Sequence, residues 1–164
     1  MTVDAMTYRQ VVGNFATGVA VVTAGKGESS CAVTVNSFTS VSLDPTLLLV
    51  CLTTASRTRA EIMQSKAFNI NVLSEQQEHI SRFFAKPQED TSWFGEFGCR
   101  EGELGAPIIP DCLAHIECHL TQTHDAGDHT ILIAEVQHAY IAQEDRPLLF
   151  FRGKYGQLAE TPEG

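Results

Sequence analysis

Short hydroxyl and amide side chains gather between residues 34 and 45, in the segment TVNSFTSVSLDP. Apolar runs flank this segment, GVAVVT from Gly18 and LLLVCL from Leu47, and both are typical of buried strands. A flat ligand with polar edges needs apolar surface for its rings and a few hydrogen-bonding groups for its edge, here Thr34, Asn36 and Ser37. The alternative is a Ser/Thr-rich loop that satisfies its own backbone, and the segment alone leaves both interpretations open.

Three further positions could complete a site for an anionic, aromatic ligand. Ser56, Arg57 and Thr58 begin a predicted helix, whose free backbone N–H groups and dipole favour a phosphate. Arg82 lies on the next predicted helix, and the turn Gly127-Asp128-His129 presents an imidazole at the start of a strand. Each has a structural alternative, since Ser56 could be only a helix cap, Arg82 a surface charge and His129 the end of a hairpin.

A second group of chemically capable residues, Cys112, His115, Cys118 and His119, could suggest a metal site. In a strand, however, Cys118 points to the face opposite both histidines, so the four side chains cannot converge. We therefore interpret His115, Glu117 and His119 as a solvated strand face and predict no metal site.

The cysteines are odd in number and irregularly spaced, which argues against a disulfide framework. Those in apolar runs are expected to be small core residues, and none has a neighbour that would make it a nucleophile. The five cysteines of the chain are Cys31, Cys51, Cys99, Cys112 and Cys118.

Length and charge limit the possible classes of function. The 164 residues suit one domain, residues 1–164. The net charge is −9 without any run of Lys or Arg, which argues against binding to nucleic acid or an anionic membrane. No apolar run approaches the roughly 20 residues of a membrane span, and the first residues lack the layout of a secretory signal. A cytoplasmic protein is expected.

The hydrophobic pattern predicts more strands than helices. Residues 8–15 have helical spacing, Ser56 caps a helix through residue 63, and Ser74 with Gln77 forms a capping box before another helix. Residues 86–110 read as a long irregular segment with Trp93, Phe94 and Phe97, and residues after Leu158 are expected to fray. Strands are predicted at 18–23, 31–35, 46–52 (fully buried), 67–72 (half-exposed), 112–123, 129–142 and 148–151. This order favours a mainly antiparallel barrel with a few peripheral helices.

These segments together resemble one known family. The matching stretches cover about residues 8–155 and are FATGV (15–19), TVNSFTSVSLDP (34–45), SRT (56–58), FNINVL (68–73), RF (82–83), GDH (127–129), PLLF (147–150) and GKY (153–155). The chain resembles the short-chain flavin reductases, which are the reductase components of two-component flavin-dependent monooxygenases. The resemblance implies an FMN-binding split β-barrel of Greek-key type that works as a homodimer. It also implies reduction of FMN or FAD by NADH or NADPH and delivery of reduced flavin to a separate oxygenase.

The resemblance also implies roles for individual residues. Thr34, Asn36 and Ser37 would contact the edge of the isoalloxazine, and His129 would be the catalytic residue at the nicotinamide face. Residues 56–58 would hold the flavin phosphate, with help from Arg82 and Phe83. The remaining cofactor-binding residues are then Ser40, Val41, Ser42, Cys51, Asp128 and Tyr155.

Two functions follow from different classes of protein. The first is an NAD(P)H:flavin oxidoreductase, in which His129 orients the nicotinamide and the protein contributes mainly by positioning. The second is a non-catalytic module that stores or senses flavin. The Gly127-Asp128-His129 turn favours the enzyme, because a binding module needs no imidazole at the nicotinamide face. The choices between NADH and NADPH and between FMN and FAD stay open at this point.

Overall fold

The computed structural model describes residues 2–159, which form mostly strands. The strands are β1 (Thr17–Gly18), β2 (Ala20–Ala24), β3 (Cys31–Val35), β4 (Phe38–Leu43), β5 (Thr46–Thr53), β6 (Ala67–Val72), β7 (Arg100–Glu101), β8 (Pro107–Ile108), β9 (Ala114–Ala126), β10 (His129–Ile141), β11 (Leu149–Phe151) and β12 (Lys154–Gly156). The helices are α1 (Ala5–Val12), α2 (Arg57–Ser65), α3 (Glu78–Phe84) and α4 (Trp93–Glu96), with 3₁₀ turns η1 (Gly27–Ser29) and η2 (Glu75–Gln77). The fraying expected after Leu158 falls, beyond Ala159, outside the described residues.

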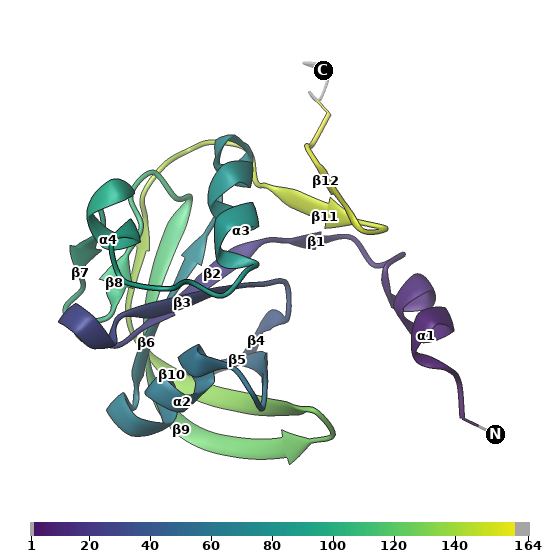
Figure 1. Ribbon diagram of the computed structural model, residues 1–164, viewed down its shortest axis with the longest axis horizontal. Coiled ribbons are helices and arrows are strands. Elements are labelled where there is room, and N and C mark those ends of the chain that lie inside the picture. Colours follow the sequence, from purple (N-terminus) through teal and green to yellow (C-terminus); the bar gives the residue numbers. More distant parts are fainter. Residues whose placement is uncertain (1, 160–164) are drawn as a thin grey trace.

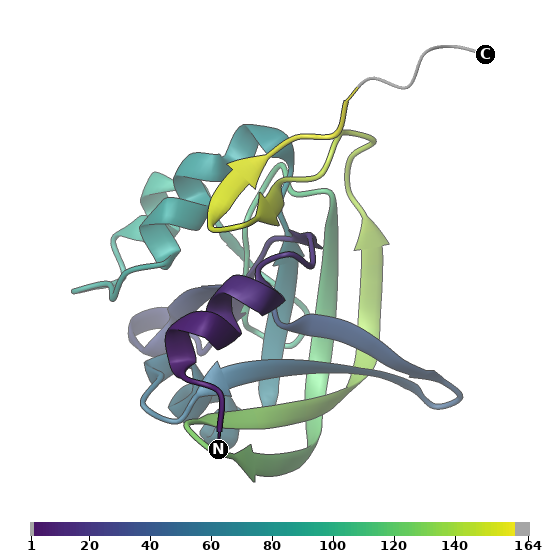
Figure 2. The same cartoon turned by 90° about the vertical axis from the view of Figure 1, so that its right-hand side faces the viewer.

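Seven strands form one antiparallel sheet in the order β3-β2-β6-β9-β10-β5-β4. The long hairpin of β9 and β10 contains two register shifts, and both strands bend strongly along their length (Figures 1 and 2). Such irregularities curve a sheet. The edge strands β3 and β4 follow each other in sequence but form no ladder together, so the curved sheet stays open there. The expected mainly antiparallel fold with few helices is confirmed.

The core lies on both faces of this sheet. In β2, Ala20 and Val22 pack into one buried cluster, which also contains Ile62 of α2. Val21, on the opposite face of β2, packs into a second cluster with Ile80 of α3. Both faces of β2 are therefore covered, which explains why an uninterrupted apolar run suits this strand.

The burial of β5 and β6 is the reverse of the prediction. We expected residues 46–52 to be fully buried, but β5 alternates between buried and more exposed positions because it lies beside the edge strand β4. We expected residues 67–72 to be half-exposed, but Asn69 and Asn71 of β6 are completely buried. This strand is central in the sheet, and residues 107–109 cover its second face.

Helix α1 projects away from the sheet, as Figure 1 shows at the right. Asp4 caps it through bonds from the backbone N–H groups of Met6 and Thr7, and it ends at Val12 rather than at the predicted Phe15. None of its residues is buried, and Phe15 is 77% exposed. No helix within residues 2–159 is long and apolar enough to cross a membrane.

The segment 86–110 is more ordered and more buried than expected. Trp93, in the segment predicted to be irregular, is only 1% exposed and packs edge-on against Phe84 of α3 at 5.0 Å between ring centroids. Phe94 and Phe97 pack against the same cluster. The aromatic residues of this segment therefore fold onto α3 and complete the core.

Polar side chains of three central strands hold residues 104–109 against the sheet. The Thr23 hydroxyl donates to the carbonyl of Pro107, and the Asn71 Oδ1 accepts from the Ile109 N–H at 2.9 Å. Glu117 Oε2 accepts from the Leu104 N–H at 2.9 Å. The prediction of a solvated face for His115 and Glu117 is wrong, because this segment buries both side chains.

Candidate functional site

The residues predicted to hold a phosphate surround a cavity at the N-terminus of α2, which we call the helix-end cavity. Ser56, Arg57 and Thr58 line it, and its volume is about 340 Å³. The Ser56 Oγ accepts a hydrogen bond from the Arg59 N–H at 3.3 Å. As the first two residues of the helix, Arg57 and Thr58 have N–H groups without intrahelical partners. The positive end of the helix thus faces space that an anion can enter.

The opposite boundary of the helix-end cavity comes from the residues that follow α3. Ala85, Lys86, Pro87 and Gln88 line it, so Lys86 supplies a second positive charge beside Arg57. The sequence analysis missed Lys86 because it comes after the predicted helix, in a segment with no regular pattern.

Arg82 was expected to assist the same phosphate, but its contacts lie elsewhere. Its guanidinium forms an ion pair with Glu78 at 2.6 Å and lies over the ring of Tyr155 at 4.8 Å from the centroid. Phe83, its neighbour, is partly exposed and packs edge-on against Phe84 and Phe97. The structure therefore brings Arg82 to Tyr155 rather than to Arg57.

A second cavity, the Thr34 cavity, contains part of the predicted ring-edge set. Its volume is about 240 Å³, and it shares Ala85 with the helix-end cavity. The Thr34 hydroxyl donates to the Ser81 carbonyl at 2.7 Å, and the Ser81 hydroxyl is 2.7 Å from the Tyr155 hydroxyl. The lining residues are Val19, Thr34, Val35, Asn36, Ser81, Ala85, Phe150 and Tyr155.

Among the three predicted ring-edge residues, only Asn36 has an uncommitted side chain. The Ser37 Oγ donates to the Cys51 carbonyl at 2.7 Å and accepts from the Cys51 N–H at 3.3 Å. Thr34 is committed to Ser81, whereas the exposed Asn36 amide makes no hydrogen bond to another described residue. The structure thus offers one free amide to a ligand edge, with Thr34 and Ser37 fixing the strand ends around it.

Other predicted residues near this site lie on the edge hairpin. Ser40, Val41 and Ser42 belong to β4, where a register shift leaves Val41 unpaired and 47% exposed. The Ser42 Oγ accepts from the Asp44 N–H at 3.2 Å. None of the three lines the helix-end or Thr34 cavity. Cys51 lies beneath Ser37, and burial raises the pKa of its thiol.

Asp128 and His129 form the tip of the β9–β10 hairpin. The His129 Nδ1 lies 2.7 Å from the Asp128 Oδ1, and this hydrogen bond holds the pKa of the Asp128 carboxyl below its usual value. The Asp128 carbonyl accepts from the Thr54 N–H at 2.9 Å. His129 pairs across the strands with Thr53, which itself lines the helix-end cavity. The imidazole is therefore next to the phosphate end and outside the lining of the Thr34 cavity.

The four residues Cys112, His115, Cys118 and His119 do not converge. Within residues 2–159, no group of three or more His, Cys, Asp or Glu side chains is arranged to hold a metal ion. His115 Nδ1 lies 3.2 Å from the Asn71 Oδ1, and burial lowers the pKa of this imidazole.

Comparison with known proteins identifies the family. The model of the flavin reductase like domain matches residues 12–159. The chain is 38% identical over 153 residues to HsaB, the reductase subunit of a flavin-dependent monooxygenase from Rhodococcus jostii (strain RHA1), covering 93% of this chain and 77% of that protein. It is also 38% identical over 156 residues to the FMN reductase (NADH) SmoA of Agrobacterium fabrum (strain C58 / ATCC 33970), covering 95% and 87% respectively.

A solved structure agrees with these matches. The NADH:FAD oxidoreductase SgcE6 of Streptomyces globisporus C-1027, in complex with NAD and FAD fragments, superposes with a TM-score of 0.91 at 36% identity. The match covers 98% of this chain and 96% of that one. The family predicted from the sequence motifs is confirmed: the chain belongs to the flavin reductase like domain family.

Proposed function

We propose that the 164 residues form a single flavin reductase-like domain in which NADH or NADPH reduces FMN or FAD. The prediction of an NAD(P)H-dependent flavin reductase is confirmed at the level of the family, since its named relatives include an FMN reductase (NADH) and an NADH:FAD oxidoreductase. The observation that carries the local assignment is the helix-end cavity. There Arg57, Lys86 and the start of α2 surround a space that neighbours the Thr34 cavity, since Ala85 lines both.

The residues present fit a flavin. A phosphate at the helix-end cavity would meet the Arg57 and Thr58 N–H groups and two cationic side chains. From there, the Thr34 cavity offers apolar surface at Val19 and Phe150 for rings and the free Asn36 amide for a polar edge. The unpartnered helix N-terminus therefore lines one of two neighbouring cavities, and the uncommitted amide lines the other.

The protein has few acid–base tasks in this reaction. A flavin, when bound, would supply the hydride-accepting chemistry, so the task of the protein residues is to hold the flavin and nicotinamide rings together. Asp128 accepts from His129 Nδ1–H, which keeps the imidazole in one orientation and leaves Nε2 available for a ligand. We assign to His129 the task of orienting the nicotinamide, because its side chain is half-exposed and pairs across the strands with Thr53, which lines the helix-end cavity.

A homodimer is part of this proposal. The apolar side chains of α1 and of the residues after it are exposed in the single chain. Three of them, Tyr8, Val12 and Phe15, line a groove that also contains Asn36. Burial of such a surface between two copies would stabilise the position of α1. The exposed apolar residues are Met6, Tyr8, Val11, Val12 and Phe15.

We also propose a separate oxygenase as the recipient of reduced flavin. HsaB and its counterparts are reductase subunits of two-component monooxygenases, which supports the same division of labour here. The five free thiols support a cytoplasmic location, where cysteines stay reduced. The net charge of −9 supports a protein that binds neither nucleic acid nor membrane.

The test follows nicotinamide absorbance while a trace of protein is mixed with NADH or NADPH and an excess of FMN or FAD. Rapid oxidation of the nicotinamide is expected with one preferred pair of nucleotide and flavin. It should continue over many turnovers, because each reduced flavin leaves and an oxidised flavin replaces it. Saturable flavin binding without nicotinamide oxidation would contradict the proposal and favour a storage or sensing module instead. Absence of both binding and oxidation would remove the flavin assignment altogether.

A further inference from the structure

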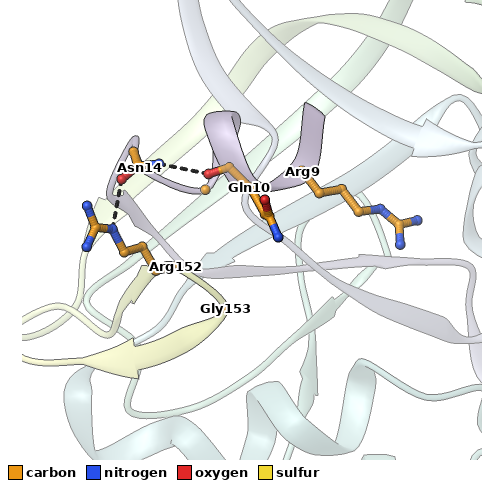
Figure 3. Close-up of a pocket in the computed structure, with 6 residues that line it drawn as sticks. Arg9, Gln10, Asn14, Arg152 and Gly153 are labelled. Atoms are coloured by element: carbon orange, nitrogen blue, oxygen red, sulfur yellow. Dashed lines mark hydrogen bonds between the residues drawn. The ribbon is translucent and has the colours of Figure 1, made fainter. Parts of the chain in front are cut away.

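A third cavity lies where α1 meets the β11–β12 turn, and we call it the arginine cavity. Its volume is about 490 Å³, within the range of small-molecule sites. Figure 3 shows Arg152 at one end, Arg9 at the other and Gln10 between them. The lining residues are Arg9, Gln10, Gly13, Asn14, Arg152 and Gly153.

The charge of this lining is unusual for the chain. The protein has 20 acidic and only 11 basic residues, yet two arginines and no carboxylate line the cavity. Gln10 and Asn14 add neutral amides, while Gly13 and Gly153 leave the backbone accessible. A concave surface with positive charge and amide donors is suited to an anionic, polar ligand.

Arg152 is held in place by contacts that leave its terminal nitrogens free. Its Nε donates to the Asn14 Oδ1 at 2.8 Å, and its guanidinium lies over the Phe151 ring at 4.9 Å. Its Nη groups make no hydrogen bond to any residue of the described chain, 2–159. Asn14 is itself fixed by a bond from its Nδ2 to the Gln10 carbonyl at 2.7 Å. The guanidinium is therefore positioned to donate into the cavity.

The backbone at Arg152 gives an independent reason to assign it a function. Arg152 and Gly153 are the two central residues of the β11–β12 hairpin and have φ values of 49° and 77°. Such turns prefer Asn, Asp or Gly at the first position, because other residues adopt positive φ at a cost of about a kcal/mol or more. A large cationic residue in this conformation is the kind of strain that collects at binding sites.

Arg9 provides the second charge and lacks an ion pair within residues 2–159. The hydrogen bond and charge of His129 lower the pKa of the Asp128 carboxyl most, and the positive charge of Arg9 adds a smaller effect in the same direction. The charge of Arg9 is therefore felt at the turn that contains His129. Arg9 also lines a neighbouring groove of about 520 Å³ that contains Asn36 and Ser37. The arginine cavity therefore adjoins the groove that contains two of the predicted ring-edge residues.

The position of the arginine cavity relative to the other two cavities indicates which ligand it binds. The phosphate of a flavin would lie in the helix-end cavity, which adjoins the Thr34 cavity at Ala85. The arginine cavity adjoins the ring region from another side, through Arg9, Gly13 and Gly153. We propose that the arginine cavity binds the pyrophosphate of the nicotinamide dinucleotide, with Arg9 and Arg152 as its anion-binding residues. This inference rests on the proposed flavin reductase function.

The two guanidiniums do not converge on one point in Figure 3. Arg9 and Arg152 extend to opposite sides of Gln10, so one compact phosphate ion cannot use both. An elongated diphosphate with attached riboses can contact both ends. Adenosine diphosphate ribose is therefore expected to bind well, and inorganic phosphate to compete only weakly.

The experiment uses three variants: Arg9→Gln, Arg152→Gln and the double variant of both arginines. Lys154→Gln is the matched control, because this exposed cation lies in the same hairpin as Arg152 but outside the cavity lining. Each arginine variant should raise the KM for the preferred nicotinamide nucleotide by about tenfold, as expected for one charge-assisted contact, with kcat within about twofold. The affinity for adenosine diphosphate ribose, measured by calorimetry without turnover, should fall in parallel. The affinity of the arginine variants for FMN should not change. The control Lys154→Gln should keep the KM of the unchanged protein for the nicotinamide nucleotide.

Three results would overturn the inference, and a fourth would separate it from the proposed function. Unchanged KM and unchanged binding of adenosine diphosphate ribose, in variants that still reduce flavin, would reject the arginine cavity and leave the proposed function intact. A loss of affinity for FAD, with unchanged affinity for FMN and the nucleotide, would assign the cavity to the adenosine half of FAD. A change in sedimentation without a change in nucleotide binding would assign the arginines to a contact between copies. Binding of adenosine diphosphate ribose that depends on both arginines, in a protein that does not reduce flavin, would support the cavity and reject the proposed function.

Discussion

Arg57 and Lys86 line the same cavity although they belong to the ends of two different helical segments. Arg57 is the first residue of α2, and Lys86 follows the last turn of α3. Because the N-terminus of α2 adds its own positive field, three sources of positive potential meet in a chain whose net charge is −9. This is the local feature that most directly supports a phosphate-bearing ligand.

Ser56 allows the cap of α2 to be separated from ligand binding. Ser56→Asp should keep the cap, because a carboxylate also accepts from the Arg59 N–H, but should repel a phosphate. Ser56→Ala should lose about 1 kcal/mol of unfolding free energy and weaken FMN only modestly. Urea unfolding and FMN titration of both variants measure the two effects. Equal FMN affinity in Ser56→Asp and the unchanged protein would exclude the phosphate from this end of α2.

His129→Ala should raise the KM for the nicotinamide nucleotide or slow flavin reduction, because the group that orients the nicotinamide is lost. Asp128→Asn should act in the same direction but less, since an amide oxygen can still accept from Nδ1–H. Stopped-flow reduction under anaerobic conditions measures the step directly. A collapse of flavin affinity in His129→Ala, with nucleotide affinity unchanged, would show that this residue belongs to the flavin site.

Glu117 is buried with one carboxylate oxygen unused. Its Oε1 and the Oδ1 of its cross-strand neighbour Asn69 have no hydrogen-bond partner among the described residues. Glu117→Gln keeps an acceptor for the Leu104 N–H and adds a donor for Asn69, so it should be at least as stable. Glu117→Ala should lose about 2–4 kcal/mol, from an unpaired N–H and a cavity. Thermal unfolding of both variants tests this, and a less stable Glu117→Gln would mean that the carboxylate itself is required.

His115 should make stability depend on pH. Burial, followed by the positive charge of Arg100, lowers the pKa of His115 from 6.5, while Glu117 acts in the opposite direction. The unfolded chain therefore takes up the proton first as the pH falls, and the contribution of His115 is present above about pH 6.5 and lost below it.

Urea unfolding between about pH 5 and pH 7.5 measures this contribution. The difference in stability between the unchanged protein and His115→Asn should grow as the pH rises toward 6.5 and level off above it. His124→Asn, in the exposed part of the hairpin, serves as the control and should leave the slope unchanged. A pH-independent difference for His115→Asn would contradict the assignment.

Features that depend on neighbouring residues could be predicted from the sequence. The Ser56 cap involves a residue three positions away, and the Ser74–Gln77 capping box has the same range. The turn at Asp128 follows from Gly127, whose φ is 65°. Such signals also carried the family motifs, which is why the family and the mainly antiparallel fold were predicted correctly.

Features that depend on distant segments could not be predicted. The burial of Glu117 requires cover from residues 102–104, which have no regular pattern of their own. The resemblance implied that Arg82 helps to hold the phosphate, but Arg82 lies one turn from Glu78 on the same helix face and pairs with it. Lys86 takes the place beside Arg57 only because α3 ends at Phe84 and the chain turns back.

The most direct test of the account compares the affinities of FMN and riboflavin, which differ only in the phosphate. The account predicts that FMN binds more tightly and that Arg57→Gln with Lys86→Gln lowers its affinity by about 1–3 kcal/mol for each lost contact, while riboflavin is nearly unaffected. The Lys154→Gln variant should retain the preference for FMN. Equal losses for FMN and riboflavin in the double variant would contradict the placement of the flavin phosphate between Arg57 and Lys86.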